Sequence, residues 1–594
     1  MPFTDCIFNL RFGKRSTPVC RTRVRCNSEA MKSQCLLPTK NNLLHYSLSL
    51  CCREAGILLL SILFISSCKF RQKVNTVVHH AKIYTVDDNF SVAEAMAIRD
   101  GKIIATGTDD EILKEYEAPE MLDAEGKTIF PGFIDAHCHF TGFATDMWKC
   151  QLVGTTSFAD VIEKIKAYSQ HAPMQWIFGR GWDQNAWAMK EYPDKKILDS
   201  LFPDRPVFLK RIDGHAALVN QTALNIAGIT ADTKIEGGSI ELENGQPTGI
   251  LIDNAMELAE AKIPQINDSL AKKYFADAQR LCFAVGLTGV HDCGISEHTV
   301  DLVDAAQKAG DLKMKIFALL TDNPTYYASW IKKGPYVTER LHVGGFKLYA
   351  DGALGSRGAC LLHDYTDKPG WKGFLRSDAA HFTAVANMLV NTPFQMCTHA
   401  IGDSGNRTIL KIYARALKGK NDKRWRVEHA QVVDAADFHF FADNNIIPSV
   451  QPTHATSDMY WAEKRLGAER IKTAYAYKQL LAANNWLPLG TDFPVEDISP
   501  FKTFFAAVVR KDAKGFPAAG FQTENAISRE QAMRGMTIWA AKAAFEEKEK
   551  GSLQIGKAAD FIMLDKDLMK CAEADILKTA VLETYINGER VYKK

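Results

Sequence analysis

The feature that most constrains the fold of this chain is an alternation of short apolar segments with stretches of helical length between residues 131 and 545. The apolar segments are typical of buried strands, among them TIFPGFIDAH, VGLTGVHDCG, VGGFKLYADG, PFQMCTHAIGD, RWRVEHAQVV and WLPLGTDFP. Strands that alternate with helices form parallel sheets, because each crossover returns the chain to the same end of the sheet. The pattern therefore predicts an α/β fold, which we interpret as a TIM-like (β/α)8 barrel.

The spacing of polar residues at the strand ends agrees with a barrel. Lys347, His399, His429 and Asp492 each end an apolar segment, which is where such barrels place functional groups. If they mark strands 4, 5, 6 and 8, the 145 residues from Lys347 to Asp492 cover four units. That is about 36 residues per unit, near the roughly 31 of a 250-residue barrel.

The first strand end stands too far from the fourth. His139 and Lys347 are 208 residues apart, about 99 more than three units of that pitch need. The segment 175–260 differs from its surroundings, because it is rich in Gly and Asn and in turn-like sequences. We therefore expect an inserted subdomain between strands 1 and 2, at about 175–260, that covers the barrel mouth and shapes a substrate pocket.

Strand-like sequences flank the barrel at both ends of the chain, with hairpin turns expected at Asp100-Gly101 and Asn587-Gly588. The economical arrangement is one composite β-sandwich, which would cover otherwise exposed strand edges. We expect its two parts at residues 69–130 and 546–594, around a hydrolase barrel of residues 131–545. The adjacent His79 and His80 should point to opposite faces of a strand and be structural.

Residues 1–68 are predicted to be an extension and a signal. The apolar run at 56–65 is shorter than the about 20 residues of a membrane-spanning helix, but it has the length of a signal-peptide core. LLLSILFISSC resembles a bacterial lipoprotein signal with Cys68 as the lipid acceptor, and a buried strand or helix end is the alternative. We expect export and a lipid anchor, with the folded part periplasmic or on the cell surface, and a true start after Met31.

Composition excludes some function classes. Lys and Arg number 72 against 70 Asp and Glu, so no electrostatic signature of a nucleic-acid-binding protein is present. The seven cysteines that follow Cys68 are widely spaced, which predicts no required disulfide.

His137 and His139 lie two residues apart at the end of an apolar strand, so the period of two places both imidazoles on one face. Two neutral imidazoles are half of a site for a divalent metal such as zinc. Taken alone, this pair is only weak evidence for a metal site, since a strand end that is merely polar would show the same pattern. A barrel brings its carboxyl-terminal strand ends together, and the other strand-end residues strengthen the hypothesis.

The motifs PGFIDAHCHF, GFKLYADGALGSRGA, THAIGDSGNR, RVEHAQ, QPTHATSDM and GTDFPVE resemble the amidohydrolase superfamily from about residue 75 to the end. In particular they resemble the branch called amidohydrolase family 3, which includes N-substituted formamide deformylase-like proteins. The resemblance implies one or two divalent metals, with zinc the first choice. The implied metal-binding residues are His137, His139, Lys347 as a carboxylated lysine, His399, His429 and Asp492.

These residue types suit hydrolysis of an amide. Bound metal lowers the pKa of water and polarises a carbonyl, while Asp492 can move a proton from water to the leaving nitrogen. An unmodified Lys347 would repel a cation, and the family resemblance implies its carbamate, which we favour over an ion pair with Asp351; a mononuclear site stays open. Candidates for substrate contact are Arg180, Trp182, Asp183, His215, Arg357, Gln451 and His454. His291 and Asp292 are at most indirect contributors.

The sequence therefore predicts a metal-dependent hydrolase of a non-peptide carbon–nitrogen bond, acting on a small amide-type molecule. One alternative keeps the barrel and changes the reaction to deamination, ester hydrolysis or isomerisation. Another is a solute-binding lipoprotein without catalysis, although such a binder has no need of Asp492. The sequence leaves the substrate and the oligomeric state open, including a homo-oligomer.

Overall fold

The computed structural model describes residues 71–172 and 174–594. The apolar run and Cys68, on which the lipid anchor was predicted, lie outside the described residues. Among the helices that are described, none combines the length and the apolar character needed to cross a bilayer.

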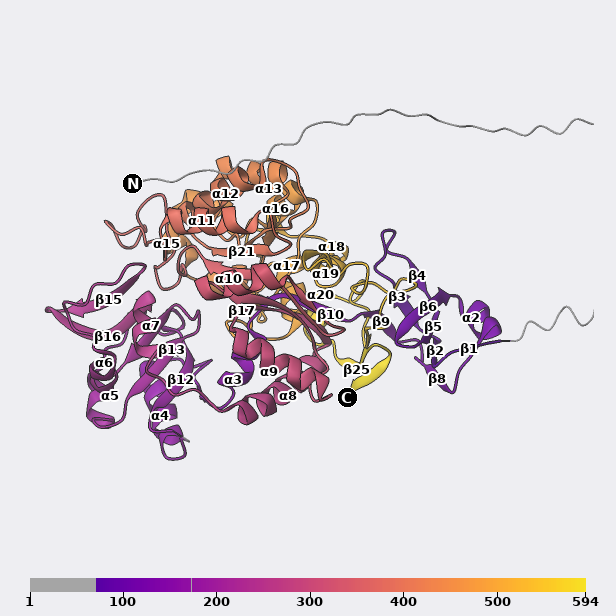
Figure 1. The fold of residues 1–594 in the computed structure, drawn as a ribbon, viewed down its shortest axis with the longest axis horizontal. Coiled ribbons are helices and arrows are strands. Elements are labelled where there is room, and N and C mark those ends of the chain that lie inside the picture. Colours follow the sequence, from indigo (N-terminus) through magenta and orange to yellow (C-terminus); the bar gives the residue numbers. More distant parts are fainter. Residues whose placement is uncertain (1–70, 173) are drawn as a thin grey trace, which may run out of the picture. The chain divides into compact units, whose positions relative to one another are not determined.

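The central sheet is parallel and follows the predicted order of β/α units (Figure 1). Its strands are, in order, β10 (Phe133–Cys138), β17 (Leu287–Ile295), β18 (Lys315–Thr321), β20 (Leu341–Tyr349), β21 (Gln395–Ala400), β22 (Arg426–His429) and β23 (Ile447–Ser449), with β19 (Tyr336–Val337) antiparallel to β20. The helices of this part are α3 (Phe140–Asp146), α8 (Asp268–Ala284), α9 (Glu297–Lys308), α10 (Pro324–Lys333), α11 (Ala379–Leu389), α12 (Asp403–Leu417), α13 (His439–Asn444), α14 (Pro452–Asp458), α15 (Ala462–Arg470), α16 (Tyr477–Asn484), α17 (Pro500–Val509), α18 (Arg529–Gly535), α19 (Ile538–Ala543) and α20 (Glu573–Ile576). The α/β prediction is confirmed.

The eighth barrel position is occupied by residues 487–492, which pair as an isolated bridge and not as a full strand. Leu489 bridges in parallel to Val450 of the β23 side. On the other side, the Ala136 N–H donates to the Leu489 carbonyl at 3.1 Å and the Asp492 N–H donates to the His137 carbonyl at 2.8 Å. The barrel is thus nearly closed, and Asp492 is fixed beside the end of β10.

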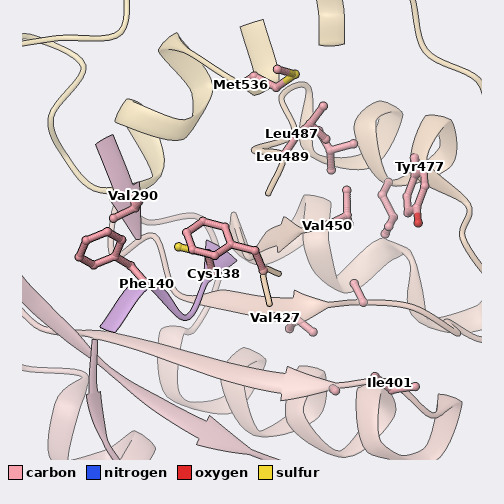
Figure 2. Packing of buried hydrophobic residues seen from close by; sticks show 14 of the residues in the cluster. Cys138, Phe140, Val290, Ile401, Val427, Val450, Tyr477, Leu487, Leu489 and Met536 are labelled. Atoms are coloured by element: carbon pink, nitrogen blue, oxygen red, sulfur yellow. The ribbon is translucent and has the colours of Figure 1, made fainter. Parts of the chain in front are cut away.

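The core of the barrel is built from buried aliphatic and aromatic side chains of the strands and the surrounding helices. Figure 2 shows part of it, with Val427, Val450, Leu487 and Leu489 among the packed residues. Because the apolar residues fill the wall between strands and helices, polar side chains are left for the strand ends.

The composite β-sandwich is confirmed. One sheet has the order β6 (Lys102–Gly107), β5 (Ala95–Arg99), β2 (Thr76–His79) and β8 (Glu120–Asp123). The other sheet combines both ends of the chain, in the order β26 (Glu589–Lys593), β25 (Val581–Ile586), β24 (Phe561–Leu564), β9 (Thr128–Pro131), β3 (Lys82–Tyr84) and β4 (Val92–Ala93). Buried residues of both sheets form one cluster, which includes Met96 and Phe561. A helix, α2 (Asp109–Glu115), and the short pair β1 (Gln72–Lys73) and β7 (Tyr116–Glu117) complete this part.

Both predicted hairpin turns are present. Asp100 and Gly101 have φ values of 51° and 74°, and Asn587 and Gly588 have 50° and 73°. Two consecutive positive φ values match the twist of a two-residue hairpin.

The predicted opposite orientation of His79 and His80 is wrong. Their ring centroids are 4.8 Å apart, because β2 ends at His79 and His80 adopts a φ of 50°. The period of two therefore stops at His79.

The insertion between the first two barrel strands is confirmed as a six-stranded mixed sheet, drawn in purple and magenta in Figure 1. Its order is β11 (Cys150–Gln151), β12 (Ile177–Trp182), β13 (Val207–Arg211), β14 (Ala216–Val219), β16 (Gln246–Asp253) and β15 (Gly238–Glu243), with helices α4 (Phe158–Ser169), α5 (Lys196–Leu201), α6 (Gln221–Ala227) and α7 (Asn254–Glu260). The inserted sheet begins at β11, ahead of the predicted boundary at about residue 175. The predicted boundary was too late because β11 and α4 lack the Gly-rich composition of the rest of the insertion.

Candidate active site

Five of the six residues proposed from the strand ends line one cavity of about 720 Å³ at the carboxyl-terminal end of the barrel, and the sixth, His137, is fully buried beside Asp492. His137 is on β10, Lys347 on β20, His399 on β21 and His429 on β22. They therefore stand on the first, fourth, fifth and sixth strands, as the spacing indicated. The remaining two are His139, which precedes α3, and Asp492.

The distances within this group are short. His139 Nε2 lies 3.3 Å from Asp492 Oδ1, and His137 Nε2 lies 3.6 Å from the same oxygen. The His137 and His429 ring centroids are 4.7 Å apart, and those of His399 and His429 are 4.6 Å apart. The structure thus brings together side chains that are up to 355 residues apart in sequence.

Each of the four strand-end histidines has one ring nitrogen engaged by a protein acceptor. His137 Nδ1 donates to Glu428 at 2.5 Å, and His139 Nδ1 donates to the Cys293 carbonyl at 2.9 Å. His399 Nε2 donates to the Gly352 carbonyl at 3.3 Å, and His429 Nδ1 donates to Gln451 Oε1 at 2.7 Å. Because a carbonyl or carboxylate oxygen only accepts, these contacts place the ring proton on the engaged nitrogen and leave a lone pair on the other.

The contact to His137 belongs to a buried charged network. Glu428 accepts from Arg426 Nε at 2.5 Å, and Arg426 also contacts His291 Nδ1 at 2.9 Å. Arg426 and Glu428 are 0% exposed. A carboxylate of this kind, which fixes the tautomer and the orientation of a histidine, is a regular companion of metal-binding imidazoles.

Protonation states follow from burial and from the neighbouring charges. Burial lowers the pKa of His137 to about 4 and holds the pKa values of His399 and His429 well below the ordinary histidine value. Burial favours protonation of Asp492, yet the neighbouring His139 and His454 hold its pKa well below the usual range. Burial likewise opposes a charge on His454, but the carboxylate of Asp492 raises its pKa to about 9. The site therefore offers neutral imidazoles, one carboxylate and one imidazolium.

Lys347 is fully buried, and its Nζ lies 3.1 Å from His137 Nε2. Burial opposes its ionisation, but the neighbouring Tyr349, together with Cys293 and nearby carboxylates, raises its pKa. Among the described residues it forms no ion pair with Asp351. Asp351 instead accepts three backbone N–H groups, those of Cys360, Ile401 and Gly402.

The donor set fits a divalent metal. His137, His139 and Asp492 each offer one atom within 4.8 Å of the others, and His429, His454 and Asp492 do the same. Asp492 Oδ1 is buried without a hydrogen-bond partner in the described part of the chain. Neutral imidazole nitrogens and a carboxylate oxygen are the ligands that zinc accepts, whereas the imidazolium of His454 has no lone pair to offer.

The inserted sheet supplies one wall of the cavity. Arg180 pairs with Asp146 at 3.4 Å, and Asp183 pairs with Arg211, and all four side chains line the cavity. The predicted insertion over the barrel mouth therefore shapes the pocket, as expected.

His215, also from the insertion, is held by a residue that the sequence did not indicate. Its Nδ1 lies 2.6 Å from Asp253 Oδ1, and its ring centroid lies 4.9 Å from that of His399. Asp253 is buried at a φ of 49°, and its carboxylate packs so closely on Gly352 that a Cβ there would approach to 2.1 Å. A strained, buried aspartate that orients a histidine is typical of a functional site.

The other candidates divide into two groups. His454 lines the cavity, with its Nε2 3.5 Å from Asp492 Oδ2, and Gln451 orients His429. Trp182 is buried inside the inserted sheet and donates to the Leu209 carbonyl at 2.7 Å. Arg357 pairs with Asp367 at 3.0 Å. The structure does not bring Trp182 or Arg357 into the lining of this cavity.

Comparison with known proteins places these observations in a family. Residues 120–592 match the family described as "Amidohydrolase family". Over 539 residues the chain is 33% identical to Protein LONG AFTER FAR-RED 3 of Arabidopsis thaliana, and the match covers 87% of this chain and 91% of that protein. It is 28% identical over 549 residues to the N-substituted formamide deformylase of Arthrobacter pascens, covering 88% and 99% of the two chains. Among solved structures, an uncharacterized metal-dependent hydrolase from Pyrococcus horikoshii OT3 superposes with a TM-score of 0.69 at 26% identity, covering 84% of this chain and 99% of that one.

Proposed function

Because the chain belongs to the amidohydrolase family, we propose that it hydrolyses a non-peptide carbon–nitrogen bond of a small amide-type molecule with the help of a divalent metal, zinc being the first choice. The observation that carries this proposal is the convergence of His139, His399 and His429 on one cavity beside Asp492, with the buried ring of His137 next to the same carboxylate. The relative from Arthrobacter pascens, named for its action on N-substituted formamides, supports an amide substrate.

His137, His139 and Asp492 would hold the metal, with His399 and His429 as further ligands. A divalent metal at such a site lowers the pKa of bound water toward about 7 and polarises a carbonyl group. The contacts of His137 Nδ1 to Glu428 and of His139 Nδ1 to the Cys293 carbonyl orient the two rings so that each Nε2 lies near Asp492 Oδ1.

Asp492 is the proposed proton carrier. Its lowered pKa keeps it a carboxylate at neutral pH, so it can accept the proton that the attacking water releases. It then delivers this proton to the leaving nitrogen, which as an amide anion would be prohibitively basic. His454, 3.5 Å away, holds the carboxylate in place and keeps a positive charge near the developing oxyanion.

His215 is proposed to contact the substrate from the inserted side. Since Nδ1 is engaged by Asp253, its Nε2 is the atom left for a ligand in the cavity. Arg180 and Asp183 would border the same ligand, and specificity would depend on this wall.

The chemical state of Lys347 determines which of two forms the proposed metal site takes. As the carbamate formed from the neutral amine and carbon dioxide, with loss of one proton, it would offer anionic oxygens to the metal site in place of a repelling ammonium. As an ammonium it donates to His137 Nε2, at 3.1 Å, and leaves a single-metal site. The ammonium form is the one that goes with the alternative reactions, which are deamination, ester hydrolysis and isomerisation.

An amide panel tests the function. Purified protein is analysed for metal, and release of amine or ammonia from formamides, N-acyl amines and cyclic amides is measured with and without a chelator. We expect chelator-sensitive turnover of at least one amide. Bound metal without turnover of any amide, ester or amine would support the solute-binding alternative.

Export and a lipid anchor at Cys68 remain part of the proposal. Membrane fractionation of the parent chain and of the Cys68→Ser variant tests it, and equal distribution of the two would contradict it.

A further inference from the structure

A second cluster of metal-ligating side chains lies in the composite β-sandwich. His79 ends β2, His80 follows it, and Asp123 ends β8 directly across from His79 in the parallel β2–β8 pair. One ligand atom of each residue lies within 4.8 Å of the other two. We propose that His79, His80 and Asp123 bind a divalent transition-metal ion, such as zinc, at a site independent of the proposed active site.

The backbone explains why two consecutive histidines share a site. In a strand they would point to opposite faces, but the φ of 50° at His80 turns its ring toward that of His79. Two hydrogen bonds hold this turn: the His80 N–H donates to Asp109 Oδ1 at 2.9 Å, and the Gly126 N–H donates to the His80 carbonyl at 2.7 Å. A non-glycine residue at positive φ is uncommon and is held there by its surroundings.

The spacing is close to what a tetrahedral ion requires. Ligand atoms about 2.1 Å from zinc are about 3.4 Å from one another. His80 Nδ1 already lies 3.2 Å from both oxygens of Asp123. The His80 and Asp123 side chains are 59% and 50% exposed, so they can turn toward His79 at little cost in packing.

The donor chemistry selects the class of ion. Two imidazoles and one carboxylate suit zinc, nickel or copper, whereas magnesium and calcium prefer sites made of oxygen ligands. His79 Nδ1 is buried and has no hydrogen-bond partner among the described residues. Coordination through this nitrogen would remove the cost of an unsatisfied buried group.

The expected consequence is stabilisation of the sandwich. The ion would join the end of β2 to the end of β8, residues that are more than 40 positions apart in sequence. If it binds only the folded chain, free zinc at about 100 times the dissociation constant raises the folded-to-unfolded ratio about 100-fold. A plain hydrogen bond between His80 and Asp123 is the competing explanation, and it does not involve His79.

Calorimetric titration of the chelator-stripped full chain with zinc alone tests the site. The variants are His79→Gln and Asp123→Asn, and the matched control is His298→Gln. His298 is similarly exposed and lies 2.9 Å from Asp268, but no third ligand joins this pair among the described residues.

We expect His79→Gln and Asp123→Asn each to lose one equivalent of bound zinc, or to bind it at least tenfold more weakly, while His298→Gln matches the parent chain. Equal stoichiometry and affinity in all four proteins would overturn the proposal. If Asp123→Asn fails to fold, as circular dichroism would show, His79→Gln alone decides. The result does not depend on whether the barrel hydrolyses an amide, because the loss is counted against the parent chain.

Discussion

Replacing Glu428 by glutamine tests how the barrel prepares the imidazole of His137. The carboxylate accepts from His137 Nδ1 and from Arg426 Nε, each at 2.5 Å, and is fully buried. The side-chain amide of the variant would have one oxygen and one NH2 group, so one of these two donors would face another donor. The substitution therefore leaves a buried charge or a buried N–H unsatisfied in either orientation.

The substitution should lower both the stability of the fold and the affinity for metal, and the magnitude of each effect can be estimated. Removing one partner of a buried ion pair costs about 3–5 kcal/mol in the free energy of unfolding. Loss of the carboxylate that orients a metal-binding histidine typically weakens metal affinity about 10–100-fold. Urea denaturation of the metal-free chain measures the first effect, and competition with a zinc-binding dye measures the second.

A matched variant separates the two effects. Glu546→Gln also removes a paired carboxylate, one that is 16% exposed, pairs with Lys550 at 2.7 Å and is not among the residues that line the cavity. It should lower stability without changing zinc affinity at the active site. If Glu428→Gln binds zinc as tightly as the parent chain, then the contact to His137 has no role in metal binding and the reasoning fails.

Further outcomes are expected from other parts of the molecule. Asp492→Ala should abolish hydrolysis while circular dichroism shows an intact fold, and a fully active variant would remove Asp492 from the mechanism. His215→Gln and Asp253→Asn should each lower kcat/KM about 10–100-fold with an unchanged metal content, and a change in zinc content instead would show that the pair acts on the metal. Burial opposes ionisation of Glu546, but Lys550 lowers its pKa to about 2. Its contribution to stability is therefore present above the unfolded pKa of about 4.3 and is lost as pH falls toward 2. The stability difference between the parent chain and Glu546→Gln should shrink over that range, and a constant difference would contradict the assignment. Bicarbonate should raise the metal content from one to two per chain if Lys347 forms a carbamate, and an unchanged content would leave the ammonium form.

The positions of the proposed ligands could be predicted from sequence because a barrel fixes where strand ends meet. Lys347, His399 and His429 each end an apolar segment, and the pitch of the β/α units assigned them to strands 4, 5 and 6. The same arithmetic required an insertion after His139. These inferences needed only the order of the elements and their lengths.

The groups that orient these ligands could not be predicted in this way. Glu428 reaches His137 across the barrel from another strand, and no local pattern links residues 291 positions apart. Its place next to Arg426, two residues away on the same strand face, was the one available signal. The pairing of His215 with Asp253 depends on how the insertion folds.

The predicted orientation of His79 and His80 was wrong for a different reason. Alternation along a strand was the correct rule, but it applies only while the strand continues. The positive φ at His80 ends it, and a histidine carries no signal for that conformation comparable to glycine.

Diffraction at the zinc absorption edge, from crystals grown with zinc and bicarbonate, tests the central claim most directly. We predict an anomalous peak within about 2.0–2.2 Å of the free nitrogens of His137 and His139 and of an oxygen of Asp492. A structure with zinc bound elsewhere, and with these three side chains hydrogen-bonded only to protein or water, would contradict the account of this site.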